Sequence, residues 1–226
     1  MKTVSILIFL GLGILVAIFG FAKPGIPISE EGQKLLGAVT KNDLAAVPQL
    51  LQRGANVDSR DARGRTALLV AVAANYIDMA RLLIDAGADV NAQDQQSDSP
   101  LLLAGAEGTL EILKLILQAK PDFSLYNRFG GTPLIPACER GHVEVVKTLL
   151  QTDVEVDHVN NLGWTALLEA IILSDGGPRH EEIVQLLVDG GADVNIADFL
   201  GVTPLQHARL KGFRNIGKIL ESGGAK

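Results

Sequence analysis

Glutamates and histidines in two similar stretches of this chain are the residues that could perform acid–base chemistry. His142 lies in RGHVE, with Glu139 before it, and His180 lies in PRHEE, with Glu169 before it. These four side chains could serve a hydrolytic reaction if they converged on a pocket. The sequence has no nucleophile elbow, phosphate-binding loop or metal motif beside them. A hydrolase is therefore the weakest function hypothesis, and we expect no catalytic residues.

Metal and thiol chemistry have equally little support. None of the four histidines shows the i, i+4 pairing with a third ligand that a metal site requires. Cys138 is the single cysteine, so neither an intramolecular disulfide nor a cysteine-based zinc site can form. We expect Cys138 to be buried and inert, His158 to be solvated in a loop, and the protein to hold no metal or cofactor.

The elements that would position these residues repeat along the chain. A threonine or serine recurs with spacings of 33, 33, 33 and 38 residues, at Thr66, Ser99, Thr132, Thr165 and Thr203. An independent landmark, the turn after the second apolar run of each unit, shares this period and the same five-residue insertion; it falls at Gly54, Gly87, Lys120, Asp153, Gly191 and Gly224. Two landmarks with one period indicate a repeat architecture.

Each unit has the pattern of two short helices joined by a turn. In the second unit, Thr66 can cap a first helix, and Leu68 and Ala71 share one face of it. A second set of apolar residues follows at helical spacing, namely Ile77, Ala80, Leu83 and Ile84. Gly87 stands where this second helix should end.

The motifs G-x-T-[AP]-L and L-L-x-x-G-A-D-V-N resemble ankyrin repeats. They stand here as GRTALLVA, GGTPLIPACERGHVEVVKTLL, GWTALLEA, LLVDGGADVNIAD and GVTPLQHA. The resemblance implies an all-α fold, a solenoid of stacked helix-turn-helix units with protruding β-hairpin-like loops. It divides residues 31–226 into six repeats, 31–60, 61–93, 94–126, 127–159, 160–197 and 198–226.

A narrower resemblance to a group of bacterial ankyrin proteins favours a bacterial protein. His142 and His180 occupy a position where the ankyrin pattern itself prefers histidine, which favours a structural role for both. The histidine that usually follows T-P-L is absent, so its hydrogen bonds must be replaced by apolar packing or lost; the position holds Leu69, Leu102, Ile135, Leu168 and Gln206.

The N-terminus resembles a secretory leader. Lys2 precedes residues 4–21, which carry no charge, and Gly20 and Ala22 suit a signal-peptidase cut before Lys23. Residues 1–22 are thus a signal peptide or an uncleaved membrane anchor, since the apolar run falls between the two length ranges. Residues 23–30 follow as a linker. We expect a periplasmic protein or, alternatively, one anchored in the inner membrane through residues 4–21 with its repeats facing the periplasm.

The net charge of −6 argues against a nucleic-acid partner, because phosphate binding needs a dense basic face. A protein partner and a monomeric chain are the expectation. The leading function hypothesis is a non-enzymatic protein-binding scaffold. The alternative is an inhibitor or immunity protein that neutralises a toxin or an envelope enzyme.

The family resemblance implies that partners contact the concave side, formed by loop tips and first helices. Aromatic residues at three successive tips, Phe129, Trp164 and Phe199, predict an apolar ridge over repeats 4 to 6. The alternative is that these rings pack between neighbouring loops. The other candidate contacts are Arg128, Leu162 and Leu200 on the tips and Glu139, Arg140, Glu169 and His207 on the first helices.

The insertion in repeat 5, ILSDGGPRH, is expected to extend the turn between its two helices beside the concave surface. Asp175, Arg179 and His180 are the candidate contacts there. A tolerated loop without a partner is the alternative.

Overall fold

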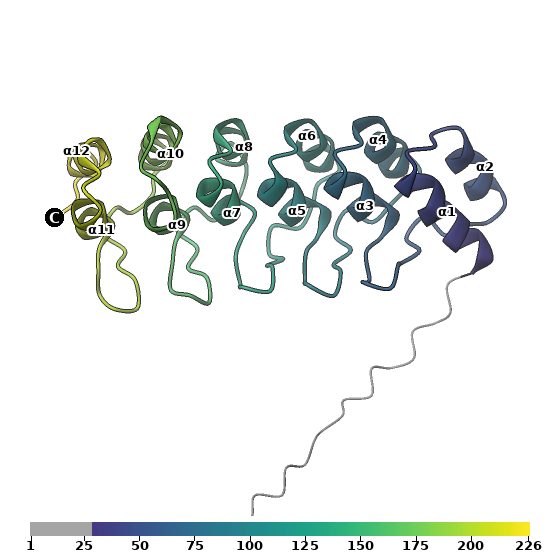
Figure 1. Ribbon diagram of the computed structural model, residues 1–226, viewed down its shortest axis with the longest axis horizontal. Coiled ribbons are helices and arrows are strands. Elements are labelled where there is room, and N and C mark those ends of the chain that lie inside the picture. The colour runs from purple at the N-terminus through teal and green to yellow at the C-terminus, as the bar shows by residue number, and fades with distance from the viewer. Residues whose placement is uncertain (1–28) are drawn as a thin grey trace, which may run out of the picture.

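A computed structural model describes residues 29–226, in which twelve helices form six stacked pairs (Figure 1). The first helices of the pairs are α1 (Glu30–Thr40), α3 (Ala67–Ala73), α5 (Pro100–Glu107), α7 (Leu134–Glu139), α9 (Ala166–Ile172) and α11 (Pro204–Leu210). The second helices are α2 (Ala46–Gln52), α4 (Ile77–Asp85), α6 (Leu110–Gln118), α8 (Val143–Leu149), α10 (Pro178–Asp189) and α12 (Arg214–Ser222). The predicted all-α solenoid is confirmed.

The helices form two rows, and long loops project beyond the row of first helices (Figure 1). The loops approach hairpins without forming strands; Arg60 and Thr66 make an isolated antiparallel bridge. Consecutive first helices pack against one another, and α7 against α9 is the most extensive of these contacts. Residues from successive repeats therefore lie side by side on the surface between loops and first helices.

The recurring threonine or serine starts four of the first helices. The Thr66 hydroxyl accepts the Leu69 N–H at 3.3 Å, and Thr203 forms a full capping box with Gln206. Ser99 and Thr165 cap α5 and α9 in the same way. Repeat 4 differs because α7 begins at Leu134, one position later in its repeat, and the buried Thr132 hydroxyl has no hydrogen-bond partner among residues 29–226.

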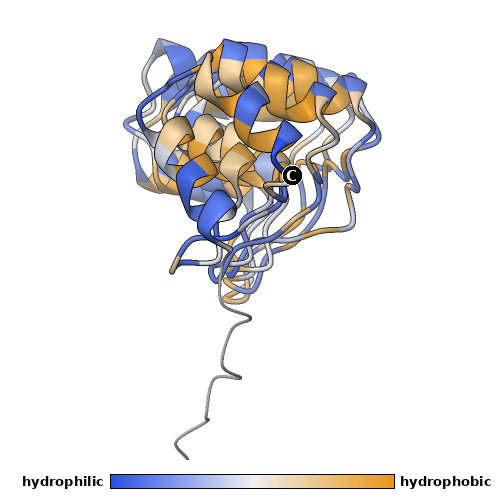
Figure 2. Ribbon diagram, turned by 90° about the vertical axis from the view of Figure 1, so that its right-hand side faces the viewer, coloured by the Kyte–Doolittle hydropathy of each residue, from blue (hydrophilic) through white to orange (hydrophobic). Residues whose placement is uncertain are grey.

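The core lies between the two rows of helices, where apolar faces meet (Figure 2). Leu69 and Leu168, at the position where ankyrin repeats usually carry histidine, are fully buried, so apolar packing does replace the missing side chain. Cys138 is also fully buried, and burial raises the pKa of its thiol well above the ordinary value. Such a thiol behaves as a small apolar side chain.

The segment after each second helix links neighbouring repeats through the backbone. The Asp58 carboxylate accepts the Asp89 N–H at 2.9 Å, and the Asn91 side chain accepts the Asp122 N–H at 2.8 Å. Asp157 accepts the Asp193 N–H at 3.0 Å in the same manner. The polar residues of the ADVN-type motif thus fix the spacing between repeats.

Two boundary predictions need correction. The insertion in repeat 5 does not only lengthen a turn, because α10 begins at Pro178 and has 12 residues, against seven to nine in the other second helices. Proline suits the first turn of a helix, where its missing N–H has no partner to lose. Glu30, assigned to the linker, is the first residue of α1, and Ser29 caps this helix because its side chain accepts the Gly32 N–H.

The predicted leader, residues 1–22, and most of the linker lie outside the described residues. Within residues 29–226 no helix is both long and apolar enough to cross a membrane.

Candidate partner-binding groove

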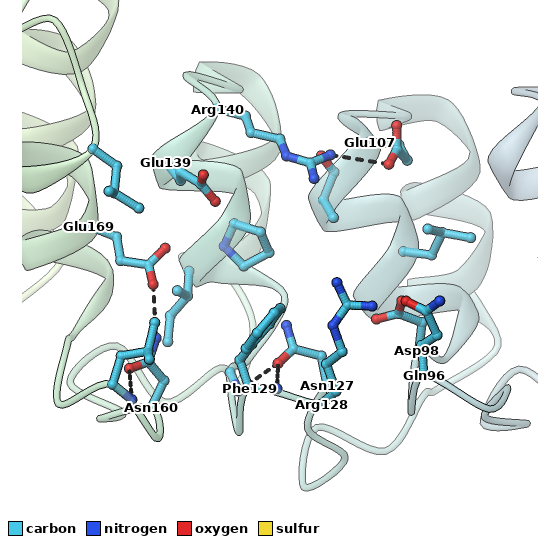
Figure 3. Close-up of a pocket in the computed structure, with 17 residues that line it drawn as sticks. Gln96, Asp98, Glu107, Asn127, Arg128, Phe129, Glu139, Arg140, Asn160 and Glu169 are labelled. Carbon is cyan, nitrogen blue, oxygen red and sulfur yellow. Dashed lines mark hydrogen bonds and ion pairs between the residues drawn. The ribbon is translucent and has the colours of Figure 1, made fainter.

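A groove of about 420 Å³ opens between the loops and the first helices of repeats 3 to 5 (Figure 3). Its loop-side lining is Gln96, Asp98, Asn127, Arg128, Phe129, Gly131, Asn160 and Leu162. Its helix-side lining is Leu103, Ala106, Glu107, Ile135, Pro136, Glu139, Arg140, Glu169 and Leu173. Six of the thirteen partner-binding residues predicted from sequence line this groove.

The apolar part of the groove is built by side chains that stay accessible. Phe129 and Leu162 are 47% and 49% exposed, and each is the third residue of its loop. The Arg128 guanidinium lies 4.7 Å from the centre of the Phe129 ring, a cation–π contact. Each of these loops is held rigid by its first residue; the Asn127 side chain, for example, accepts the Phe129 and Gly131 N–H groups at 2.9 Å.

Glu169 is the most unusual residue of the groove. It is only 5% exposed, and its Oε1 accepts a hydrogen bond from Asn160 Nδ2 at 2.8 Å. Burial, followed by the negative charge of Glu139, raises the pKa of Glu169 to about 7, while the Asn160 hydrogen bond acts in the opposite direction. Figure 3 shows the second oxygen of Glu169 pointing into the groove on the side of Glu139.

The two arginines of the groove are already engaged. Arg140 donates to the Ala106 carbonyl at 2.8 Å and pairs with Glu107 at 3.1 Å. Arg128 lies over Phe129. Asp98 adds a partly buried carboxyl, and desolvation raises its pKa above the ordinary value. Four carboxyl groups thus share the groove with two guanidinium groups.

The hydrolytic cluster considered from sequence is not assembled. Nε2 of His142 lies 3.2 Å from the Ala106 carbonyl, and Nε2 of His180 lies 3.0 Å from the Glu139 carbonyl. Both histidines thus tie a second helix to the preceding repeat, and neither lines the groove that Glu139 and Glu169 share. Within the described part of the chain, no group of three potential ligands could hold a metal ion.

The sequence predicted a solvated His158, but the structure shows this residue packed between two loops. Its ring stacks on Tyr126 with centroids 4.3 Å apart, and its Nε2 lies 2.6 Å from the Gly130 carbonyl. Its side chain is 15% exposed. The residue therefore locks two adjacent loops together.

The predicted ridge of aromatic tips is not continuous. Phe129 lines the groove, whereas Trp164 is half-buried and Phe199 lies outside it. Phe199 covers Gly163 of the preceding loop, because a Cβ on Gly163 would lie 2.5 Å from Phe199 Cγ. Phe199 nevertheless remains 75% exposed, and Leu200 is 87% exposed at the tip beside it.

The remaining predicted contacts lie apart from the groove. Asp175 interacts with His180 at 3.5 Å at the start of α10, with Arg179 beside them. Their segment is tied to repeat 6, since Lys211 Nζ donates to the Ile172 carbonyl at 2.6 Å. His207 Nε2 lies 2.8 Å from Asp198 Oδ2 within repeat 6.

Sequence reasoning did not select Asn160, Asp98 or Glu107 as site residues. Asn160 could have been predicted most easily, because it occupies the first position of its loop, in register with Asn127 and Asp198. Its link to Glu169 follows only from the packing that brings these two residues together. The groove also lies one repeat earlier than the predicted ridge, in repeats 3 to 5.

Stacked helix pairs with loops projecting to one side define this chain as a helical repeat protein with a concave binding surface. A family model described as "Ankyrin repeats (3 copies)" matches residues 18–94, 35–127 and 101–198. The chain belongs to the ankyrin-repeat family, a family of protein–protein interaction scaffolds.

Solved ankyrin structures superpose on most of the chain. The ankyrin repeat domain ABAYE2397 of Acinetobacter baumannii AYE is 53% identical, with a TM-score of 0.83, over 85% of this chain and 98% of that one. The ankyrin repeat protein EF0377 is 44% identical, with a TM-score of 0.82 and the same coverage. The ankyrin repeat domain of Bcl-3, of the IkappaB protein family, is 28% identical with a TM-score of 0.76, over 85% of this chain and 86% of its own.

A curated relative matches a shorter segment. The ankyrin repeat protein YahD of Escherichia coli K12 is 48% identical over 58 residues, which is 26% of this chain and 29% of that protein.

Proposed function

We propose that this protein is a scaffold of the bacterial periplasm that binds a partner protein in the groove of repeats 3 to 5. The observation that carries the proposal is the groove itself. It combines accessible apolar side chains, Phe129 and Leu162, with a buried carboxyl group at Glu169. Aromatic residues are enriched at protein interfaces, and a few well-packed residues supply most of the binding energy there.

The loops and helices that form the groove suit a preorganised surface. An asparagine or aspartate at the start of each groove loop fixes its tip; the Asn160 side chain accepts the Leu162 N–H at 2.9 Å and the Trp164 N–H at 3.1 Å. Because the tips are already held, a partner need not order them on binding, which lowers the entropic cost of association.

The periplasmic assignment rests on the leader. Its length and lack of charge fit either a signal peptide or an anchor, and both place the repeats on the far side of the inner membrane. The single cysteine is buried, so it has no partner with which to mispair in an oxidising compartment.

A site-specific crosslink tests the proposal. A photo-crosslinking amino acid at position 129, inside the groove, should capture a partner in living cells, whereas the same group at position 210 should not. Leu210 is a suitable control because it is 79% exposed and does not line the groove. Mass spectrometry identifies the partner and, on the same sample, shows whether residues 1–22 remain.

Paired substitutions then separate the groove from the tip of repeat 6. In affinity pull-downs of the partner that the crosslink identifies, Phe129→Ala with Leu162→Ala should lower recovery roughly tenfold or more, and Phe199→Ala with Leu200→Ala should leave it unchanged. The reverse result would contradict the placement of the site. Protection of the repeats from protease in intact cells, and their digestion in spheroplasts, is the expected sign of a periplasmic location.

A further inference from the structure

Glu169 is a buried acid without a matching cation. Its exposed fraction is 5%, and Asn160 is its single hydrogen-bond donor among residues 29–226. Neither groove arginine pairs with it, since Arg140 is held by Glu107 and Arg128 lies over Phe129. A buried carboxylate that lacks a charged partner is costly, and a cation brought by a ligand would offset that cost.

The repeat itself does not require an acid at this position. The equivalent residues of repeats 2, 3, 4 and 6 are Val70, Leu103, Pro136 and His207. The fold therefore accepts aliphatic residues, proline or histidine here. The hydrogen bond that caps the start of α9 comes from Thr165 and not from Glu169.

The surroundings of Glu169 fit a long side chain with a positive end. Glu139 lies on the adjacent α7, on the same side of the groove as the free oxygen of Glu169 (Figure 3). Leu162 and Leu173 line the same groove and add apolar surface to it. Lysine and arginine pack their aliphatic stems on such surfaces while the charged head reaches a carboxylate.

We propose that the groove receives an arginine or lysine side chain of a partner protein, with its cationic head held by Glu169 and Glu139 and its stem packed against Leu162 and Leu173. The inference rests on the proposed partner-binding function and names the chemistry that the partner presents.

The protonation of Glu169 supplies an independent readout. Its pKa of about 7 reflects burial and the charge of Glu139, and a bound cation acts against both by favouring the ionised form. The buried Cys138 thiol on α7 also lies within the influence of Glu169. Binding of a cation near pH 6 should therefore release a proton from the protein.

The probe is the peptide acetyl-Leu-Arg-Leu-amide, titrated into the full chain and followed by NMR and calorimetry. We expect a dissociation constant on the order of 1 mM, shifts confined to groove residues, and proton release at pH 6. The citrulline peptide has the same shape without the charge and should bind at least tenfold more weakly. Equal binding of the two peptides, or no binding of either, would overturn the proposal.

Matched variants separate a binding role from a structural one. Glu169→Gln keeps the acceptor for Asn160 and should weaken the arginine peptide at least tenfold and remove proton release. Glu182→Gln, an exposed change in the same repeat outside the groove, should leave both unchanged. Unaltered binding by the Glu169→Gln protein would show that the cation sits elsewhere.

Two further experiments identify the class of ligand and distinguish failure of this inference from failure of the proposed function. If spermidine shifts the same residues at lower concentration than the peptide, the site takes free polyamines and the proposal is wrong. If crosslinking at position 129 still captures the partner equally well in the Glu169→Gln protein, the groove binds a partner but not through this acid. Loss of capture in that variant supports the inference.

Discussion

Repeats 5 and 6 place a polar pair at the same two positions, nine residues apart, with opposite chemistry. In repeat 5 the loop residue is Asn160 and the helix residue is Glu169; in repeat 6 they are Asp198 and His207. Both loop residues use Oδ1 to hold their own tip, and Asp198 accepts the Leu200 and Val202 N–H groups at 2.9 and 3.0 Å. The loops are therefore built alike, and only the second atom of each side chain differs.

That second atom sets the charge state of the site. Asp198 Oδ2 faces a histidine, and the Val202 N–H, with His207 in support, holds the pKa of Asp198 below its ordinary value despite desolvation. Asn160 offers Glu169 a neutral amide, and burial raises the pKa of that carboxyl to about 7. The pair in repeat 6 is internally satisfied, whereas Glu169 in repeat 5 receives only a hydrogen bond from a neutral amide among residues 29–226.

The largest expected effect comes from the glycines of the same two loops. Gly163 and Gly201 have φ values of +81° and +77°, but only Gly163 lies under the Phe199 ring; nothing stands within 4 Å of a Cβ on Gly201. Gly163→Ala should lower the free energy of unfolding by roughly 2–3 kcal/mol, through backbone strain and displacement of the ring. Gly201→Ala should cost about 1 kcal/mol from strain alone. Urea denaturation measures both.

Phe199→Ala in the Gly163→Ala background is the matching control. It should recover much of the difference between the two glycine variants, because it removes the ring that the new methyl group displaces. Equal costs for Gly163→Ala and Gly201→Ala would mean that Phe199 does not pack on the preceding loop. Its exposed ring would then be free for a partner, as the aromatic ridge required.

The buried acid of repeat 5 should affect stability in a defined pH window. The folded-state pKa of Glu169, about 7, lies above the ordinary value of 4.5, so the native protein holds a proton that the unfolded chain releases between these values. Its contribution to stability therefore falls as pH rises from 4.5 to 7 and stays low above pH 7. Glu169→Gln should match the parent protein at pH 4 and exceed it by on the order of 2 kcal/mol at pH 8.

Titratable groups on both adjacent first helices can influence the pKa of Glu169. Glu139 and the Cys138 thiol lie on α7, and His207 occupies the equivalent position on α11, where Asp198 already engages it. Unfolding curves of the parent protein and the Glu169→Gln variant at pH 4, 6 and 8 measure the difference. A constant difference across the range would mean that Glu169 titrates normally.

The sequence was sufficient for the architecture because one period sets the register of every repeat. It identified the threonine caps, the apolar replacements at Leu69 and Leu168, and the structural position of His142 and His180. The predicted ridge lay one repeat later than the observed groove, because the sequence alone does not distinguish the environment of Phe199 from that of Phe129. Whether a ring covers a glycine of the previous loop or lines a groove depends on one position of register within the loop, and on the packing between loops.

The smallest expected effect concerns His207, the residue that makes repeat 6 differ from repeat 5. His207→Ala removes one hydrogen bond to Asp198, whose other oxygen keeps the Leu200 and Val202 N–H groups, so the loop should remain in place. The Asp198 side chain is only 6% exposed, but the space that the imidazole leaves can admit water to the freed oxygen. The loss in unfolding free energy should therefore be about 1 kcal/mol. Urea denaturation measures it, with the exposed Leu210→Ala as a control that should change little. A loss above roughly 3 kcal/mol would indicate that the pair holds the whole C-terminal repeat, and the two polar pairs would then differ in structural importance as well as in charge.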